Sequence, residues 1–465
     1  MSKWRFLSPR LARKYAAFGP LPPPGTVKRL HLRPPLFTLL LVLFSSGCSV
    51  LGEDYAESQQ AALAAFERGN FRMAAKRFQQ EKGALDSHEW LALVETGMAW
   101  HAAGRLEKAT EFWLKAVEVS QAFGDRPTVS GRSLAEGAAS AVLNDKTLPY
   151  DGEGFEVVLL HSFLAWDYLR MGRLDDAWVE VNLAYDLQDS EQERFQSTYG
   201  MNRFARFVAA LVQELDGEAD EAQMDLRKLS RELPNHPAVQ YSLERVRKLQ
   251  GPESSSERRL AQLVVLLERG RMPAKQPKEM AYQGFRSFGR VSVPSYIRYG
   301  RGGSGQVNVM IDGASVGTPE SLEDVFQVAR ANLRDRMNWL AAKATARSIG
   351  KTVLVEVAAE AVAEEHGEAA GALVGILGSA LNFLSERADL RSWLTLPSAI
   401  HVLRVPVEPG EHEIHLQFLG SGISSPPKSL GRRNFEAGKP VFVTVRTLGR
   451  NMYAHVDGGS IVPQP

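Results

Sequence analysis

The chain has 465 residues, of which 44% are hydrophobic, and its 55 Lys and Arg against 54 Asp and Glu give a net charge of +1. This length is too great for one hydrophobic core and predicts two or three domains. The balanced charge gives no electrostatic reason to expect a nucleic-acid partner. The only cysteine, Cys48, has no partner in the chain for a disulfide.

The first segment has the order typical of a secretory signal. Lys28, Arg29 and Arg33 precede an apolar run over residues 36–44, and small residues follow. At about 1.5 Å per residue the run reaches roughly half of the ~30 Å hydrocarbon core of a bilayer, so it is too short for a transmembrane helix. We therefore predict a signal peptide and leader over residues 1–47.

The ending Ser46-Gly47-Cys48 resembles the lipobox of bacterial lipoproteins, although Ser45 stands where that motif usually has Leu, Val or Ile. The resemblance implies that Cys48 carries a lipid and that residues 48–54 are a lipidated N-terminus and tether. Ser49, which follows the cysteine, implies retention in the outer membrane on its periplasmic face. The alternative is ordinary signal cleavage, which would give a soluble periplasmic protein.

Residues 55–250 are predicted to form helices, because apolar residues recur three and four positions apart. Within them a glycine is followed five residues later by an alanine four times, in the pairs Gly69 and Ala74, Gly104 and Ala109, Gly172 and Ala177, and Gly217 and Ala222. The first two glycines are 35 residues apart, close to the period of about 34 of a tetratricopeptide helix pair. With Trp100 and Tyr168 at the first-helix aromatic position, this region resembles tetratricopeptide repeats, which implies a solenoid with a concave groove.

In the register of that resemblance, the groove is lined by apolar and aromatic first-helix residues and one histidine: Phe66, Leu91, Val94, Met98, His101, Trp166, Leu169, Phe204, Phe207 and Leu211. One interpretation is a groove for an apolar peptide or helix of a partner. The other is that these residues are core, or that the second half of the chain covers them.

Two further segments carry a narrower resemblance. Residues 144–156, which include Asp151, Glu153 and Glu156, and residues 388–397, which include Trp393, are similar to segments of an uncharacterised family of bacterial lipoproteins. That resemblance implies no known reaction. The three carboxylates are candidates for binding a cation or for acid–base catalysis, but carboxylates next to glycines are also typical of solvated loops and helix starts.

Residues 251–321 and 388–465 are predicted to form a β-rich domain, because short apolar and alternating runs are separated by turn residues. Asp312-Gly313 predicts a hairpin turn. Residues 309–319 and 409–414 are similar to pieces of extracytoplasmic β-sandwich modules of the PEGA kind. The resemblance implies an antiparallel sandwich, here interrupted by an insertion.

The insertion, residues 322–387, is predicted to be helical. Gly367, Gly371, Gly375 and Ser379 recur every four residues and form a small-residue stripe that permits close helix contact. We predict a buried helical hairpin in which residues 351–363 are the partner. The alternatives are membrane contact by residues 367–384 and a homo-oligomer formed through Gly371 and Gly375.

Two patterns suggest chemistry that their context contradicts. Residues 300–305 have the spacing of a dinucleotide-binding loop, but a strand is expected after them instead of a helix. His412 and His415 lie on a predicted strand and point to opposite faces, so they cannot share a metal from that element. We therefore assign no catalytic residue, metal or cofactor.

Together these patterns predict an α+β, multidomain protein with a tetratricopeptide-like N-terminal half and a β-sandwich-like C-terminal half. The expected function is that of a membrane-anchored periplasmic lipoprotein, a non-enzymatic scaffold that binds an unknown periplasmic or envelope protein. The alternatives are an enzyme or accessory factor acting on cell-wall or surface polymers, and a membrane-contacting export component.

Overall fold

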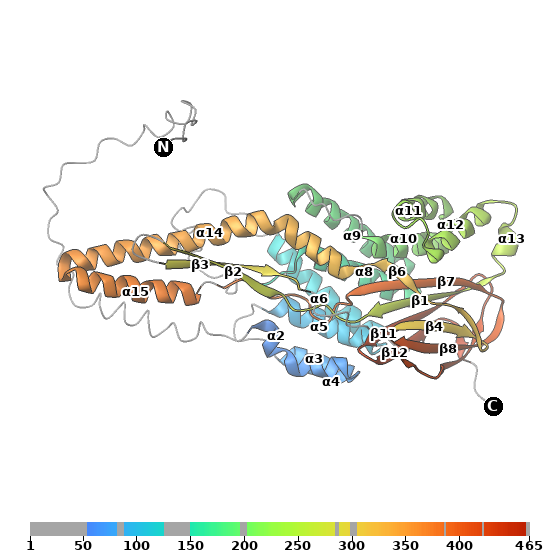
Figure 1. The fold of residues 1–465 in the computed structure, drawn as a ribbon. Helices are drawn as coiled ribbons and strands as arrows, with labels where there is room; N and C mark the ends of the chain where they lie inside the picture. The colour runs from blue at the N-terminus through green and yellow to red at the C-terminus, as the bar shows by residue number, and fades with distance from the viewer. Residues whose placement is uncertain are drawn as a thin grey trace, which may run out of the picture. The chain divides into compact units, whose positions relative to one another are not determined.

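The computed structural model describes residues 54–80, 88–124, 149–195, 202–283, 288–297, 305–385, 387–420 and 423–461. The predicted signal peptide, Cys48 and the glycine-rich residues 300–304 lie outside these ranges. All the described residues belong to one compact unit, Glu53–Pro465, which contains both the helical and the β-rich halves (Figure 1). The predicted α+β mixture of helices and sheets is confirmed.

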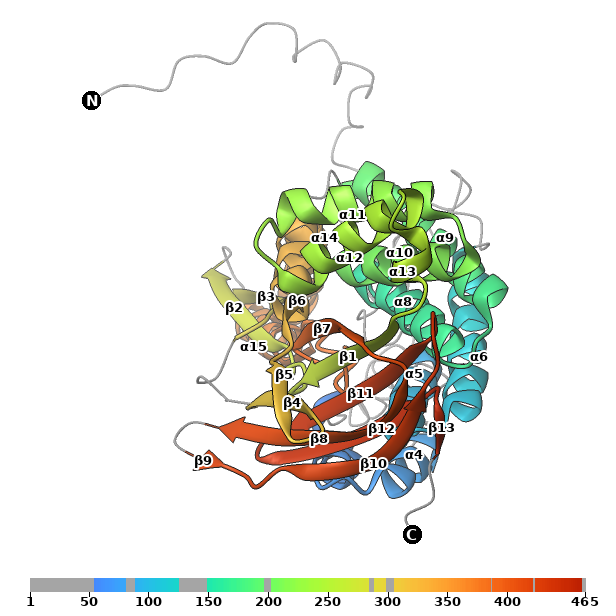
Figure 2. The ribbon, with the colours of Figure 1, turned by 90° about the vertical axis from the view of Figure 1, so that its right-hand side faces the viewer.

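The first half of the described chain is helical, as expected for a sequence rich in Ala, Leu, Glu and Arg. Its elements are α2 (Tyr55–Ser58), α3 (Gln60–Glu67), α4 (Phe71–Gln80), α5 (Glu89–Ala102), α6 (Leu106–Gly124), α8 (Gly154–Arg170), α9 (Leu174–Phe195), α10 (Arg203–Asp216), α11 (Ala219–Glu232), α12 (Pro237–Gln250) and α13 (Ser254–Glu257). Neighbouring helices pack on one another in sequence order, and the helices curve around the strands (Figure 2).

The four predicted glycines lie in the turns that join α3 to α4, α5 to α6, α8 to α9 and α10 to α11. Their φ angles are +77° at Gly69, +65° at Gly104, +74° at Gly172 and +94° at Gly217, a region that side chains with a Cβ rarely adopt. The alanine five residues later is fully buried in each case, at Ala74, Ala109, Ala177 and Ala222. The glycine–alanine pattern therefore marks four equivalent helix pairs.

The second half contains two large sheets. The five-stranded sheet has the order β12-β11-β1-β7-β6 and is formed by β1 (Ala261–Arg269), β6 (Glu320–Glu323), β7 (Ala399–Val407), β11 (Pro440–Leu448) and β12 (Asn451–Asp457). The six-stranded sheet has the path β13-β10-β8-β4-β5, with β9 paired to β8, and is formed by β4 (Gln306–Ile311), β5 (Ala314–Gly317), β8 (Gly410–Gly420), β9 (Ile423–Ser424), β10 (Lys428–Phe435) and β13 (Ser460–Ile461). The predicted turn at Asp312-Gly313 joins β4 to β5, with positive φ at both residues.

Strand β1 lies at the centre of the packing, because both of its faces are buried. Leu263 and Val265 belong to a core shared with the six-stranded sheet, whereas Val264 and Leu266 belong to the core shared with the helices. This arrangement explains the continuous apolar run in the sequence of β1, which is typical of a strand covered on both sides. The five-stranded sheet is therefore a middle layer between the helices and the other sheet (Figure 2).

The expected antiparallel arrangement of the strands does not hold for one pair. Strands β1 and β11 are parallel, with Val264 opposite Phe442, while β1 and β7 are antiparallel. A parallel pair requires a long connection between its strands. The residues between β1 and β11, which include the helical insertion, supply that connection.

The insertion forms a hairpin of two helices, α14 (Val325–His366) and α15 (Glu368–Ser385). A small two-stranded sheet of β2 (Gln276–Gln283) and β3 (Phe288–Ser295) accompanies it, and β3 packs on both helices. Gly371 lies so close to Ala359 and Ala363 of α14 that an added Cβ would collide with them, and Gly378 lies close to Val355. Of the predicted stripe, Gly371 thus faces the other helix of the same chain, and Gly375 and Ser379 are buried. Gly367 is the exception, because it is exposed in the turn between the two helices.

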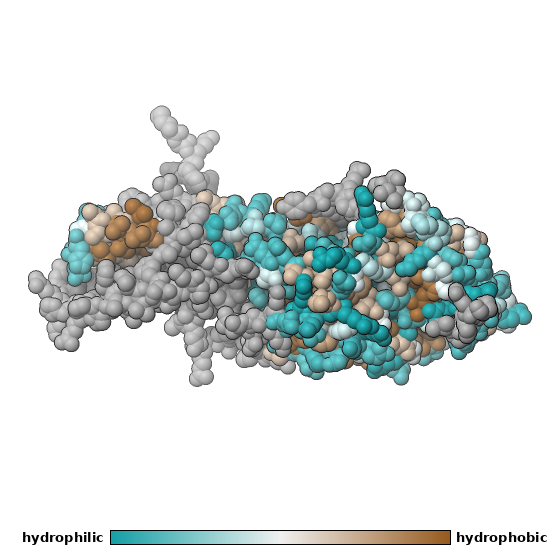
Figure 3. All heavy atoms as spheres, turned by 90° about the horizontal axis from the view of Figure 1, so that it is seen from below, coloured by the Kyte–Doolittle hydropathy of each residue, from teal (hydrophilic) through white to brown (hydrophobic). Residues whose placement is uncertain are grey.

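The hairpin is not buried as predicted. Large apolar side chains remain exposed on α14 and on α15, and Figure 3 shows an apolar patch on the hairpin. The prediction failed because the small residues occupy the face between the helices, which leaves the larger residues to point outward. In the described part of the chain no helix is both long and apolar enough to cross a membrane.

Candidate functional site

The concave side of the helices is the face on which we predicted a partner groove. Its ten predicted lining residues are at most 3% exposed, and eight of them, including Trp166 and Phe204, are fully buried. Strands β1, β7 and β11 and the segment around Trp393 lie against them (Figure 2). Of the two interpretations of these residues, the open partner groove is therefore contradicted, and the second half of the same chain covers this face.

Trp393 is a tryptophan that the second half of the chain packs against this face. Its ring is fully buried and lies 6.1 Å from that of Trp90, 6.3 Å from that of Trp113 and 6.5 Å from that of Phe163, measured between ring centroids. The aromatic rings come from helices α5, α6 and α8, so one tryptophan joins three helices. Aromatic clusters of this size contribute several kcal/mol of burial energy in total.

Buried carboxylates of two helices hold the backbone of the Trp393 segment. The Leu394 and Thr395 N–H groups donate to Glu95 over 2.6 and 3.0 Å, and the Trp393 N–H donates to Glu156 over 2.7 Å. Burial raises the pKa of both carboxyl groups to about 7, even though these hydrogen bonds lower it. The two carboxylates are thus acceptors for backbone N–H groups that would otherwise be buried without a partner.

Residues 149–156 and 388–397 meet at this point. Glu156 also accepts from the Tyr150 hydroxyl and the Glu153 N–H, and Lys275 donates to Glu153 over 2.7 Å and to the Arg391 carbonyl over 2.8 Å. Glu153 and Glu156 stand at the start of α8. The structure therefore gives these two carboxylates structural partners at a helix start, while Asp151 is exposed.

His101 forms the centre of a buried chain of charges. Its Nδ1 lies 2.8 Å from Asp167 and its Nε2 lies 2.6 Å from Glu268 of β1. Arg446 of β11 donates to the other oxygen of Glu268 over 2.9 Å, and Arg170 donates to Asp167 over 3.0 Å. All five side chains are at most 2% exposed, so the charges compensate one another inside the protein.

The electrostatics of this chain favour a protonated histidine. Burial lowers the pKa of His101, but Asp167 and Glu268 outweigh it and raise the pKa to about 9. For Glu268, burial raises the pKa, whereas His101 and Arg446 lower it more strongly, to about 2. Because both ring nitrogens of His101 face carboxylates, neither is available as a general base.

A second buried ion cluster connects α10 and α12 to β7. Glu214 accepts from Arg404 over 2.6 Å and from Arg245 over 2.7 Å, and Arg245 also donates to Glu257 over 2.7 Å. Burial raises the pKa of Glu214, but the two arginines lower it below its ordinary value. These contacts again join the helices to the five-stranded sheet.

Strand β12 lies along the glycine turns of the helices. An added Cβ at Gly69 would collide with the ring of Tyr453, and one at Gly104 would collide with the ring of His455. His455 Nε2 also lies 2.9 Å from the Ala102 carbonyl. Alternate residues of one strand therefore contact two equivalent helix turns, which the sequence repeat alone does not reveal.

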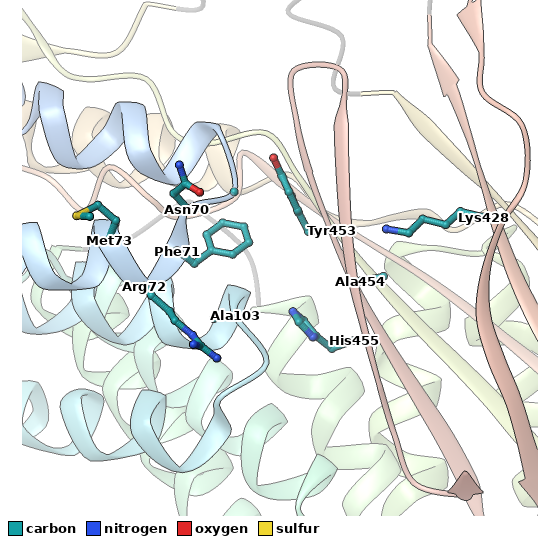
Figure 4. Close-up of a pocket in the computed structure, with 10 residues that line it drawn as sticks. Asn70, Phe71, Arg72, Met73, Ala103, Lys428, Tyr453, Ala454 and His455 are labelled. Atoms are coloured by element: carbon teal, nitrogen blue, oxygen red, sulfur yellow. The ribbon is translucent and has the colours of Figure 1, made fainter. Parts of the chain in front are cut away.

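The described chain has a surface cavity of about 670 Å³ at this contact. Figure 4 shows its lining: Gly69, Asn70, Phe71, Arg72, Met73, Ala103, Lys428, Tyr453, Ala454 and His455. Burial lowers the pKa of His455 and raises that of Tyr453. The lining of this cavity combines two basic side chains, Arg72 and Lys428, with aromatic rings and contains no carboxylate.

A second cavity of about 620 Å³ is lined by residues that include Lys248, Glu253 and Glu408.

The histidine pair of β8 does not converge. His412 Nδ1 lies 2.6 Å from Asp312, whereas His415 Nε2 lies 3.5 Å from Glu413. Among the described residues, no group of three or more His, Cys, Asp and Glu side chains is arranged to hold a metal ion.

Sequence reasoning missed the partners of His101. A signal was nevertheless present, since Glu268 and Arg446 each follow a run of apolar residues that reads as a fully buried strand. A charge in such a strand requires a buried partner. The sequence does not identify that partner.

Comparison with protein-family models, curated proteins and solved structures finds no match to this chain.

Proposed function

We propose that this chain is a lipoprotein anchored through Cys48 at the periplasmic face of the bacterial outer membrane, where it acts as a non-enzymatic assembly scaffold. The observation that carries the scaffold proposal is the filled concave face. The helices use their apolar and charged inner residues to hold the chain's own sheet, so the helices and both large sheets form one unit. Such a unit presents its other surfaces in a fixed arrangement.

The finer description of the fold belongs to the same proposal. Four helix pairs with equivalent glycines and alanines favour a tetratricopeptide-like solenoid. The core shared by the two large sheets favours a sandwich-like arrangement for the second half. In this proposal the sandwich occupies the groove in which related architectures hold a separate partner.

The contacts of the buried ionisable groups favour a scaffold over an enzyme. Glu95, Glu156 and His101 are buried, and each is hydrogen-bonded to backbone or to opposite charges. Catalytic groups need access to substrate and a free lone pair or proton. Glu95, Glu156 and His101 have no access to substrate and no free lone pair or proton. We therefore attribute their shifted pKa values to burial between the two halves of the chain.

The anchor is tested by lipid labelling and fractionation of cells that produce the full chain. The wild-type chain is expected to incorporate labelled fatty acid and to sediment with outer membranes, whereas Cys48→Ala is expected to do neither. Val179→Ala, at a position on α9 that is 56% exposed, leaves the signal segment and the thiol unchanged and serves as the matched control. The proposed lipid anchor would be contradicted by a wild-type chain without labelled fatty acid, or by a Cys48→Ala chain that still carries the label.

The scaffold role is tested by photocrosslinking in cells at one exposed and one buried position. Leu373 on α15 is 57% exposed, and Trp166 on the concave face is fully buried. A crosslinker at Leu373 is expected to capture a defined protein, and one at Trp166 is expected to capture nothing. Capture from Trp166 alone would contradict the proposal, because it would require an open concave face.

A further inference from the structure

The surface cavity of about 670 Å³ beside β12 is lined by two of the equivalent helix turns. Phe71 comes from the start of α4 and Ala103 from the end of α5, while Tyr453 and His455 come from β12. Lys428 of β10 extends toward them from the six-stranded sheet (Figure 4). The volume falls within the range of about 300–1,000 Å³ that is typical of pockets for small molecules.

The lining of this cavity is positively charged. Arg72 on α4 and Lys428 on β10 are exposed, and neither side chain forms an ion pair or a hydrogen bond with a residue that the structure describes. Burial lowers the pKa of His455, so its ring is neutral at pH 7. Because the lining has no Asp or Glu, the described chain leaves the charges of Arg72 and Lys428 uncompensated.

The second cavity, of about 620 Å³, provides a contrast. Its lining also has two basic residues, Lys248 and Arg259, but it includes three carboxylates, those of Glu253, Glu257 and Glu408. An anionic ligand in the second cavity would be repelled by these carboxylates. The first cavity therefore differs from the second in the sign of the charge that it accepts.

The start of α4 adds to the positive charge of the first cavity. The helix begins at Phe71, and its first turn, up to Met73, is part of the lining. The first N–H groups of a helix have no acceptor within the helix and carry a partial positive charge. They strengthen the attraction that the two basic side chains exert on an anion.

The rest of the lining offers apolar surface. The rings of Phe71 and Tyr453 meet edge to face with their centroids 5.0 Å apart, and Phe71 is only 6% exposed. Met73, which is 49% exposed, adds an apolar side chain to the lining. Packed aromatic rings provide contact area for the uncharged part of a ligand. An inorganic ion would leave this apolar surface without a contact.

We infer that this cavity binds a small organic anion, a molecule in which a phosphate or carboxylate group is joined to an apolar, ring-containing body. Arg72, Lys428 and the start of α4 attract the charged group, and Phe71 and Tyr453 contact the body. Binding of such a molecule goes beyond the scaffold proposal. It depends neither on that proposal nor on the lipid anchor, because every residue of the cavity lies in the compact unit Glu53–Pro465.

Binding is tested by isothermal titration calorimetry of the full chain in mild detergent, with phenyl phosphate as the probe. We expect saturable binding of one molecule per chain. Arg72→Gln and Lys428→Gln are each expected to weaken the Kd about tenfold, because each removes an attraction to the charged group. Both positions are exposed, so the substitutions do not disturb a core.

The matched controls remove the same charges elsewhere. Arg227 and Lys228 are exposed on α11, which contributes no residue to the cavity. Arg227→Gln and Lys228→Gln are therefore expected to leave the Kd for phenyl phosphate unchanged. If general attraction of anions to the chain were responsible, these controls would weaken binding as much as the cavity variants.

The contribution of the cavity itself is tested without a change of charge. Ala103→Trp keeps Arg72 and Lys428 but adds a large side chain to the lining, so it is expected to weaken the Kd about tenfold as well. Benzyl alcohol, which has the ring without the charge, and inorganic phosphate, which has the charge without the ring, are each expected to bind about tenfold more weakly than phenyl phosphate. Benzoate tests a carboxylate in place of the phosphate, and tighter binding of one of the two probes identifies the charged group that the cavity prefers.

Three results would overturn the inference. The first is that neither phenyl phosphate nor benzoate binds saturably, and the second is that Arg227→Gln weakens binding as much as Arg72→Gln does. The third is that benzyl alcohol or inorganic phosphate binds as tightly as phenyl phosphate. None of these results concerns Cys48 or the concave face, so the proposed function would stand or fall separately.

Discussion

His101 and Glu268 lie 2.6 Å apart, Nε2 to Oε1, although 167 residues separate them in the sequence. The histidine belongs to α5 and the glutamate to β1, so this ion pair joins the helical half to the middle sheet. Both side chains are fully buried. Burying opposite charges contributes little net stability by itself, but the removal of one partner leaves an uncompensated charge in the interior.

His101→Ala is therefore expected to lower the free energy of unfolding by about 3–5 kcal/mol, because Asp167 and Glu268 would both lose their shared cation. The measurement is urea unfolding followed by tryptophan fluorescence. His366→Ala, at an exposed position at the end of α14, is the control and is expected to have almost no effect. Equal unfolding midpoints for the two variants would contradict the assignment.

The same histidine predicts a pH dependence. The pKa of His101 is about 9 in the folded chain against an ordinary value of 6.5, so the folded state binds the proton more tightly than the unfolded state. The stabilisation is fully present below about pH 6.5 and is lost as the pH rises through about 9. Unfolding measured from pH 7 to 9.5 should show falling stability, and the His101 ring should titrate near pH 9 by NMR. A ring that titrates near 6.5 would disprove the charged network.

The turn glycines provide a matched pair of substitutions. Gly172→Ala introduces a Cβ at φ +74°, where it meets no described atom within 4 Å, and should cost about 1 kcal/mol from backbone conformation alone. Gly69→Ala has a similar φ of +77° but would also collide with Tyr453, which adds about 1–3 kcal/mol. Thermal unfolding should rank the two variants in this order. In a Tyr453→Ala background the two alanine substitutions should cost the same, and a persisting difference would contradict the contact with β12.

Glu95→Gln tests how the Trp393 segment is held. One oxygen of Glu95 accepts from the Leu394 N–H group and the other accepts from the Thr395 N–H group. In glutamine an NH2 group replaces one of these oxygens, so a donor would face an N–H donor and that hydrogen bond would be lost. We expect a loss of about 1–3 kcal/mol in urea unfolding. Glu111→Gln, whose parent side chain is 59% exposed, should change stability little. The hydrogen-bond assignment fails if Glu95→Gln behaves like Glu111→Gln.

Much of the secondary structure was accessible from the sequence because it depends on local patterns. The glycines at 69, 104, 172 and 217 mark real helix turns, since positive φ is a local requirement. Likewise, Asp312-Gly313 marks the β4–β5 turn, and the apolar run of β1 marks a strand buried on both faces.

The relation between the two halves was not accessible in the same way. The ten groove residues have the pattern of a helix face that is hidden from water, and that pattern is the same whether a partner or the chain itself covers them. The parallel pairing of β1 with β11 and the contacts of Trp393 join positions far apart in the sequence. Such contacts depend on tertiary packing, which periodicity does not encode.

The helical hairpin is a second case in which a sequence pattern predicted a local contact but not what surrounds it. The small-residue stripe correctly indicated close helix contact, and Gly371 does lie against α14. The stripe does not predict what the large residues on the opposite face of α15 contact. That face remains exposed at Leu373, Ile376 and Leu377.

The most direct test of the filled concave face is the reactivity of a thiol placed on it. Val94 is fully buried on α5, and Met224 is 56% exposed on α11. In the native full chain, Val94→Cys is expected to resist a maleimide reagent until the protein is denatured, whereas Met224→Cys reacts at once; the wild-type chain gives the background from Cys48. If Val94→Cys reacts in the native chain as fast as Met224→Cys, the concave face is open and the account is wrong.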